Sequence, residues 1–213
     1  LRADDRRLSL ALGLMGAVGG NVVNRRLLRL FFRQTLFSDQ RTDLPLAGRN
    51  AKWVSRASLT GGNLKTALLA SGSIPYVMQG IRDIPGAPAG IYRDGGAVDY
   101  HLDIPYGLAG RGMVLFPHYT DRIIPGWLDK KLTWRKPSPD NLADVLLVAP
   151  SPAFVSRLPL GKISDRDDFY YFAGDDRGRF DYWQKVAAAG KELAEDFAEA
   201  VATGSIQERV KPL

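Results

Sequence analysis

The residues best suited to chemistry lie in the segment 68–99, LLASGSIPYVMQGIRDIPGAPAGIYRDGGAVD. Its pattern predicts a helix that ends near Ser71, a loop rich in proline and glycine, and a strand that runs into the turn Asp94-Gly95-Gly96. Two glycines after an aspartate allow a sharp turn beside the carboxylate, because glycine lacks the Cβ that restricts the backbone. Taken alone, the tripeptide is more typical of an ordinary turn that closes a β-hairpin.

The segment as a whole resembles the patatin-like phospholipases, which are lipid acyl hydrolases with a Ser–Asp dyad. In that family an Ala-Ser-x-x-x-Pro segment, here 70–75, precedes an aromatic-rich strand and a D-G-G or D-G-A turn that holds the catalytic aspartate. The resemblance covers about residues 64–99. It implies that Asp94 is the general base and that Gly95 and Gly96 shape the turn beside the substrate.

The chemistry of such a dyad is compatible with this turn. A serine hydroxyl is a poor nucleophile at neutral pH and needs an adjacent base. The aspartate takes the proton directly, so it must lie within hydrogen-bond reach of the hydroxyl. The resemblance implies a lipid or other ester as substrate, cleavage of a carboxylic ester as in a phospholipase A, and no cofactor.

The nucleophile that the resemblance requires is not found in the chain. The family holds its serine in G-x-S-x-G, a strained turn between a strand and a helix, and none of the eleven serines has that context. The glycine-rich oxyanion segment of the family is also missing. Together with the start at Leu1 rather than Met, this predicts the C-terminal part of a longer hydrolase. We expect the N-terminal remainder of the same protein to supply the serine, and this chain alone to hydrolyse nothing.

The composition excludes several other chemistries. With no cysteine there is no thiol nucleophile, disulfide or cysteine-ligated metal site. The two histidines, His101 and His118, are too few for most histidine-rich sites, so we expect no metal. A cluster of acidic residues lacks the spacing of a calcium loop and is predicted to be a surface loop: Asp165, Asp167, Asp168, Asp175 and Asp176.

The positive charge is concentrated near the N-terminus. Residues 1–60 hold eleven basic and four acidic residues, a net charge of +7, against +6 for the whole chain. Such a surface can face anionic lipid, nucleic acid or only solvent. No RRM, KH or zinc-finger context accompanies the arginines, so we expect no nucleic-acid partner.

Within this basic region, residues 21–37 predict one amphipathic helix with Arg25, Arg26 and Arg29 on one face and Phe31 on the other. Such a helix can lie on an anionic membrane surface or pack on a core with a solvated side. The membrane interpretation supports an alternative function, a non-catalytic membrane-surface or interaction module on a degenerate patatin-like scaffold. The preceding apolar run, 8–18, is too short to span a bilayer and predicts a small-residue helix packed inside the domain. A cytoplasmic or peripheral-membrane location is therefore favoured.

Strands mixed with helices indicate an α/β fold. The resemblance implies a patatin-like sheet flanked by helices and incomplete in this chain. We expect a basic helical segment at 1–50, acting as a lid or facing a membrane, and the C-terminal part of the hydrolase domain at 51–213. The predicted elements are strands at 51–58, 91–92, 113–116 and 144–149 and helices at 63–71 and 182–201.

Overall fold

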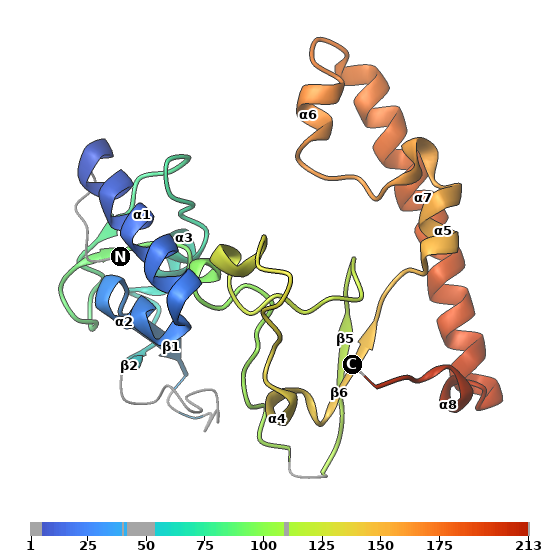
Figure 1. Cartoon of the computed structure of the whole chain (residues 1–213), viewed down its shortest axis with the longest axis horizontal. Helices are drawn as coiled ribbons and strands as arrows, with labels where there is room; N and C mark the ends of the chain where they lie inside the picture. The colour runs from blue at the N-terminus through green and yellow to red at the C-terminus, as the bar shows by residue number, and fades with distance from the viewer. Residues whose placement is uncertain (1–5, 40, 42–53, 109–110, 213) are drawn as a thin grey trace. The chain divides into compact units, whose positions relative to one another are not determined.

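A computed structural model describes residues 6–39, 41, 54–108 and 111–212. The chain divides into two compact units, unit 1 (1–115 and 122–146) and unit 2 (116–121 and 147–213). The chain combines helices with short strands, so the fold is of the α/β class (Figure 1).

Unit 1 carries the N-terminal helices and the predicted site. Its elements are α1 (Arg7–Val23), η1 (Arg25–Leu27), α2 (Leu28–Phe31), β1 (Gln34–Ser38), β2 (Val54–Ser58), α3 (Leu64–Ser71), β3 (Ile81–Arg82), β4 (Ile91–Tyr92), η3 (Gly95–Ala97), η4 (Trp127–Asp129) and α4 (Pro139–Leu142). The strands β5 (Val114–Pro117) and β6 (Val145–Val148) pair with each other and cross the boundary between the units. The described strands thus form three two-stranded sheets, β1–β2, β3–β4 and β5–β6.

The single helix predicted over 21–37 is wrong. Helix α1 ends where Asn24 adopts an extended backbone (φ −157°, ψ 123°), and the Asn24 side chain accepts a hydrogen bond from the Arg26 amide to begin η1. The chain leaves α2 at Phe32, which is also extended, and enters β1. Strand β1 pairs in parallel with β2, and its Thr, Leu and Phe residues favour a strand. Sheet pairing therefore overrides the helical periodicity of the sequence.

Helix α1 confirms the helix predicted over 8–18 and extends it at both ends, but it is not packed inside the domain on all sides, because Leu8, Leu12 and Met15 are exposed. One face packs in a core that contains Ala17, Leu28, Phe32 and Val98. The Phe31 ring lies against two small residues of α1, since a Cβ at Gly16 would come within 2.7 Å of Phe31 Cε1 and one at Gly20 within 3.2 Å of Cε2. Small residues on α1 thus allow α2 to approach closely.

Helix α3 confirms the helix predicted over 63–71 and begins one residue later, after Asn63. Asn63 occupies the cap position, but its side chain makes no cap hydrogen bond and is 2% exposed. Its Oδ1 accepts from the Thr60 amide, and its Nδ2 donates to the Ser58 and Pro85 carbonyls. Asn63 therefore joins the end of β2 to the loop that precedes β4.

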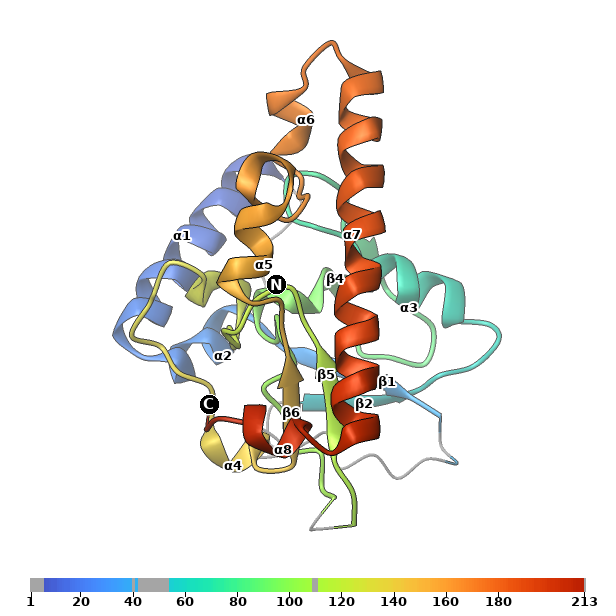
Figure 2. The ribbon, with the colours of Figure 1, turned by 90° about the vertical axis from the view of Figure 1, so that its right-hand side faces the viewer.

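Unit 2 is built on one long helix. Its elements are α5 (Pro152–Arg157), η5 (Pro159–Gly161), α6 (Asp168–Tyr171), α7 (Asp176–Thr203) and α8 (Ile206–Arg209), shown in Figure 2. The core joins Phe154 and Leu158 to Tyr182 and Val186 of α7. Helix α7 confirms the predicted helix over 182–201 and extends it at both ends. It is capped by Asp175 and ends at Gly204, which has a φ of 76°.

Candidate active site

Asp94 lies on the turn between β4 and η3. Its Oδ1 accepts a hydrogen bond from the Gly96 amide at 2.8 Å, which caps the short helix η3. Its own amide donates to the Ser73 carbonyl, so the turn is attached to the segment that follows α3. The side chain is partly buried. Local hydrogen bonds thus hold the Asp94 carboxylate in one place.

The two glycines after Asp94 meet different surroundings. A Cβ at Gly96 would come within 3.0 Å of Asp94 Oδ1 and 3.5 Å of the Tyr100 ring, so a side chain there would press on the carboxylate. A Cβ at Gly95 would have no neighbour within 4 Å. Gly96 is therefore the glycine that this turn requires for space.

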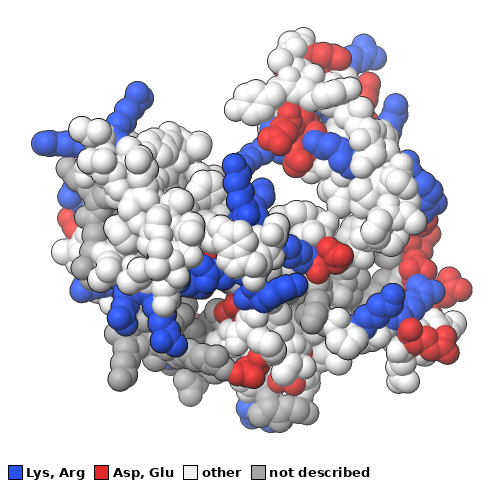
Figure 3. All heavy atoms as spheres, viewed as in Figure 1, with Lys and Arg blue, Asp and Glu red and all other residues white. Residues whose placement is uncertain are grey.

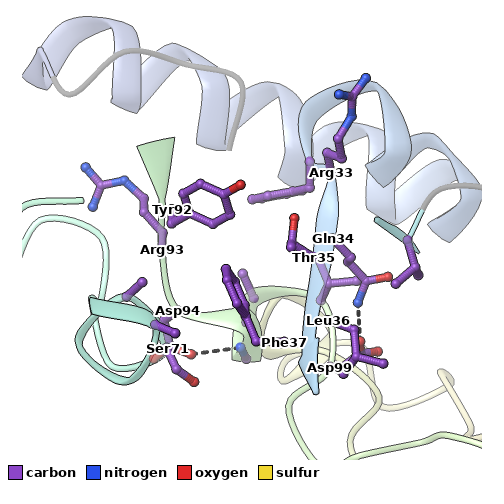
Figure 4. Close-up of a pocket in the computed structure, with 18 of the residues that line it drawn as sticks. Arg33, Gln34, Thr35, Leu36, Phe37, Ser71, Tyr92, Arg93, Asp94 and Asp99 are labelled. Atoms are coloured by element: carbon purple, nitrogen blue, oxygen red, sulfur yellow. Dashed lines mark hydrogen bonds between the residues drawn. The ribbon is translucent and has the colours of Figure 1, made fainter. Parts of the chain in front are cut away.

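Asp94 lines a cavity of about 1030 Å³ in unit 1. The wall is formed by β1, α3, β4, η3 and residues 102–105, and it is largely apolar. The rings of Phe37 and Tyr92 meet edge to face with centroids 6.0 Å apart (Figure 4). The guanidinium groups of Arg33 and Arg93 point away from Asp94 in the same view. The wall thus combines apolar side chains with charged ones, including the carboxylates of Asp94, Asp99 and Asp103, as ligand sites commonly do.

Two serines precede the turn, and they differ in accessibility. Ser73 is fully buried, and its hydroxyl donates to the Leu69 carbonyl at 2.7 Å. Ser71, at the end of α3, is exposed and lines the same cavity as Asp94. Among the residues that the structure describes, the Asp94 carboxylate accepts a hydrogen bond from Gly96 alone and from no serine. The structure therefore shows no assembled Ser–Asp pair in its described part.

A second carboxylate in the cavity wall, Asp99, is more strongly perturbed. Burial raises the pKa of Asp99 above its ordinary value, and the neighbouring Asp103 adds to this. The charge of Arg25, 3.8 Å away, and a hydrogen bond from Gln34 both act in the opposite direction. The net effect raises the pKa of Asp99, so the folded protein favours the neutral carboxylic acid more than the same group would be favoured in the unfolded chain in water. This residue had no role in the sequence-based prediction.

Arg25 connects the N-terminal helices to the Asp94 turn. Its guanidinium donates to the carbonyl of Val98, the residue that ends η3, and forms an ion pair with Asp129. Asp129 is fully buried and also accepts from Asn21 Nδ2 at 2.7 Å, with Arg135 Nε 3.5 Å away. We refer to Asn21, Arg25, Asp129 and Arg135 as the Asp129 cluster.

The four residues predicted to contact a membrane are placed in two different ways. Arg25 belongs to the Asp129 cluster, and Phe31 is partly buried against α1. Arg26 and Arg29 are exposed. The structure therefore does not bring the four side chains to one surface. The reason is the break at Asn24, which turns Arg25 toward the interior.

The acidic segment of unit 2 is not only a surface loop, because Asp168 is fully buried. Its Oδ2 accepts from Trp183 Nε1 and from the Asp165 amide, both at 2.8 Å, and Lys162 Nζ lies 2.8 Å from Oδ1. Burial alone raises the pKa of Asp168, but the hydrogen bonds from Lys162, Trp183 and Asp165 outweigh it and lower the pKa. The same contacts raise the pKa of Lys162. In the part of the chain that the structure describes, no group of three or more His, Asp or Glu side chains is placed to hold a metal ion.

The sequence carried little signal for the groups that position the turn. Asp129 lies in none of the elements or motifs predicted from the sequence, and its partners Asn21 and Arg25 are 108 and 104 residues away. One retrospective clue is Gly126, where a Cβ would come within 2.9 Å of the Val98 carbonyl and of Arg25 Nη1. His101 is buried, and its Nδ1 accepts from the Ile124 amide at 3.0 Å.

Within the described residues, no helix combines the length and the hydropathy needed to cross a bilayer.

No protein-family model matches the chain, and neither a curated protein nor a solved structure is significantly similar to it.

Proposed function

We propose that this chain is part of a serine-dependent lipid acyl hydrolase with a patatin-like sheet, in which Asp94 is the base of a Ser–Asp dyad. The nucleophilic serine and the oxyanion glycines then lie on sequence outside these 213 residues. The observation that carries the proposal is the position of Asp94, a carboxylate on a glycine turn in the wall of a cavity that also presents many apolar side chains.

The hydrogen bonding of Asp94 supports a role as base. The Gly96 amide fixes Oδ1, while Oδ2 accepts no hydrogen bond from a described residue. An anchored carboxylate with one free oxygen can accept the proton of an approaching hydroxyl without first losing a partner. Asp103, which also lines the cavity, differs in this respect, since its carboxylate accepts from the Ser138 amide and from Asn141.

The wall of the cavity supports an ester with an apolar acyl chain as the substrate. The apolar side chains of the wall come from β1, from α3 and from the segment around β4. The apolar surface is therefore larger than the area directly beside Asp94. The apolar side chains include Phe32, Leu36, Phe37, Leu64, Leu68 and Ile91. Burial of a hydrocarbon chain against such side chains is favourable in proportion to the apolar area removed from water.

Labelling with a fluorophosphonate probe tests the proposal, because the probe reacts only with an activated serine. We expect no labelling of the 213-residue chain, and labelling of the protein expressed with the sequence encoded before Leu1. In that longer protein Asp94→Asn should reduce the labelling rate at least a hundredfold, since general-base catalysis contributes about 10² to 10⁴. The exposed Asp121→Asn is the matched control and should have no effect.

Three results would overturn the proposal. The first is a start codon directly before Leu1, and the second is unchanged labelling of Asp94→Asn. The third is labelling of the 213-residue chain at Ser71, which would place the nucleophile inside it. Absence of labelling in the longer protein would favour the non-catalytic scaffold instead.

A further inference from the structure

Helix α1 has an apolar face that the rest of the described chain leaves uncovered. Exposed side chains recur along it at helical spacing, with relative exposures of 74% for Leu8, 60% for Leu12, 68% for Met15, 47% for Val22 and 80% for Val23. We call these five residues the α1 face. At 100° per residue they fall within one side of the helix, opposite the buried Leu10, Ala17 and Asn21. The α1 face is therefore one continuous apolar strip.

Within the described segment 6–38, which follows Asp4 and Asp5 in the sequence, the charged side chains have one sign. Residues 6–38 contain six arginines and no acidic residue. Arg7 lies at the start of α1, and Arg26 and Arg29 follow its end; all three are exposed. None of these three makes an ion pair with another residue in the described ranges. Figure 3 shows the uncharged surface over α1 and the blue side chains gathered below it, over η1 and α2.

We propose that the α1 face docks on the surface of an anionic lipid bilayer. An apolar strip with cationic groups at both ends is the arrangement that binds such a surface, because the apolar side chains enter the acyl boundary while the cations meet the lipid phosphates. Helix α1 then lies parallel to the membrane plane, since its other face is occupied by the core of unit 1.

The charge pattern distinguishes this occupant from a protein partner. Exposed apolar residues by themselves are compatible with any hydrophobic partner. A stretch of 33 residues without a single carboxylate repels cationic surfaces and favours a dense array of negative charge. The inference is independent of the proposed hydrolase activity, because it uses neither Asp94 nor the cavity. It also differs from the membrane contact predicted from the sequence, since Arg25 and Phe31 take no part in it.

The absence of cysteine allows a direct test. A Met15→Cys variant is labelled at its one cysteine with the environment-sensitive fluorophore NBD. The NBD emission should shift to the blue when vesicles of phosphatidylglycerol and phosphatidylcholine are added. It should shift little with pure phosphatidylcholine vesicles, and about 0.5 M salt should weaken the response, because salt screens the attraction of the arginines to the lipid. Ala173→Cys, an exposed position in unit 2, is the control label and should not respond.

Vesicle co-sedimentation with unlabelled variants separates the two contributions. Leu12→Ser with Met15→Ser should weaken binding to anionic vesicles at least tenfold, and so should Arg26→Gln with Arg29→Gln. The control Arg166→Gln with Arg177→Gln removes the same charge from exposed positions of unit 2 and should bind like the parent. Because all these side chains are exposed, circular dichroism should show parent-like folding.

Equal weakening by the control pair would mean that net charge alone drives binding and would overturn the proposal. An unresponsive label at position 15, or binding to neutral vesicles as strong as to anionic ones, would do the same. A dimer detected by light scattering that the Leu12→Ser, Met15→Ser pair dissociates would assign the α1 face to a second copy of the chain instead.

Discussion

The guanidinium of Arg25 forms an ion pair with the carboxylate of Asp129, a residue 104 positions away that has no solvent exposure. The same guanidinium donates to the Val98 carbonyl at the end of η3, the turn that begins at Asp94. One side chain thus joins the N-terminal helices, the buried acid of η4 and the predicted site.

We predict that Asp129→Asn destabilises unit 1 by about 3 kcal/mol, because removal of one partner leaves the positive charges of Arg25 and Arg135 without their buried counter-charge. Urea unfolding measures the loss. The double change Arg25→Met with Asp129→Leu removes both partners and should cost clearly less than the sum of the two single changes. Additive losses would show that the pair is not coupled.

Substitution of Gly126 tests the close packing behind the turn. A Cβ at this position meets two backbone carbonyls, those of Val98 at 2.9 Å and Ala97 at 3.1 Å, and neither can rotate away. We expect Gly126→Ala to lower the free energy of unfolding by about 1–3 kcal/mol. Gly190→Ala is the control with the opposite sign, since that glycine lies inside α7 with no atom within 4 Å of the added Cβ. It should stabilise by about 0.5–1 kcal/mol. Equal effects at both positions would contradict the packing argument.

Asp99 should make stability fall as pH rises. Its pKa in the folded state is raised above the unfolded value of about 3.9. Between the two values the folded state holds more protons than the unfolded state, so the contribution of this carboxyl to stability decreases with increasing pH. Asn cannot ionise, so Asp99→Asn should gain stability relative to the parent between about pH 4 and neutral pH. Urea titrations at several pH values measure this difference, and a relative loss over the same interval would exclude the assigned direction.

Asp168 should have the opposite pH dependence. Its folded pKa is lowered, so its contribution is complete above the unfolded value of about 3.9 and is lost as pH falls through the folded value. Asp168→Asn should therefore cost about 2 kcal/mol at neutral pH, where Lys162 loses one of its two carboxylate partners and keeps only Asp165, and the variant should be less sensitive to acid. The helical signal of α7 in circular dichroism reports unfolding of unit 2. The exposed neighbour Asp167→Asn serves as the comparison, and an equal loss there would show that burial of Asp168 is not the cause.

Asp94→Asn, in contrast, should leave the thermal transition within about 1 °C of the parent. The side-chain oxygen of asparagine can still accept from the Gly96 amide, and the position is only partly buried. A large decrease in the melting temperature would mean that Asp94 has a structural role, and a loss of activity in the same variant would then not identify a base.

Local sequence patterns predicted the elements that depend on neighbouring residues. Periodicity and apolar runs, which act within a few residues, predicted the helices over 63–71 and 182–201 and the strands at 91–92 and 144–149. The helix over 21–37 failed because its last residues pair with β2, a contact that no local pattern encodes. Secondary-structure propensity is weak enough for such a contact to override it.

The sequence by itself determined the chemistry that the chain can offer: a carboxylate on a glycine turn, no thiol, few imidazoles and an arginine-rich segment, 6–38, without acids. Only the tertiary structure decided which charges are neutralised and which remain exposed. Arg25 and Arg26 are adjacent in the sequence, yet the break at Asn24 directs Arg25 to Asp129 while Arg26 stays in solvent. Burial determines this difference, because a charge can leave water only where a distant partner compensates it.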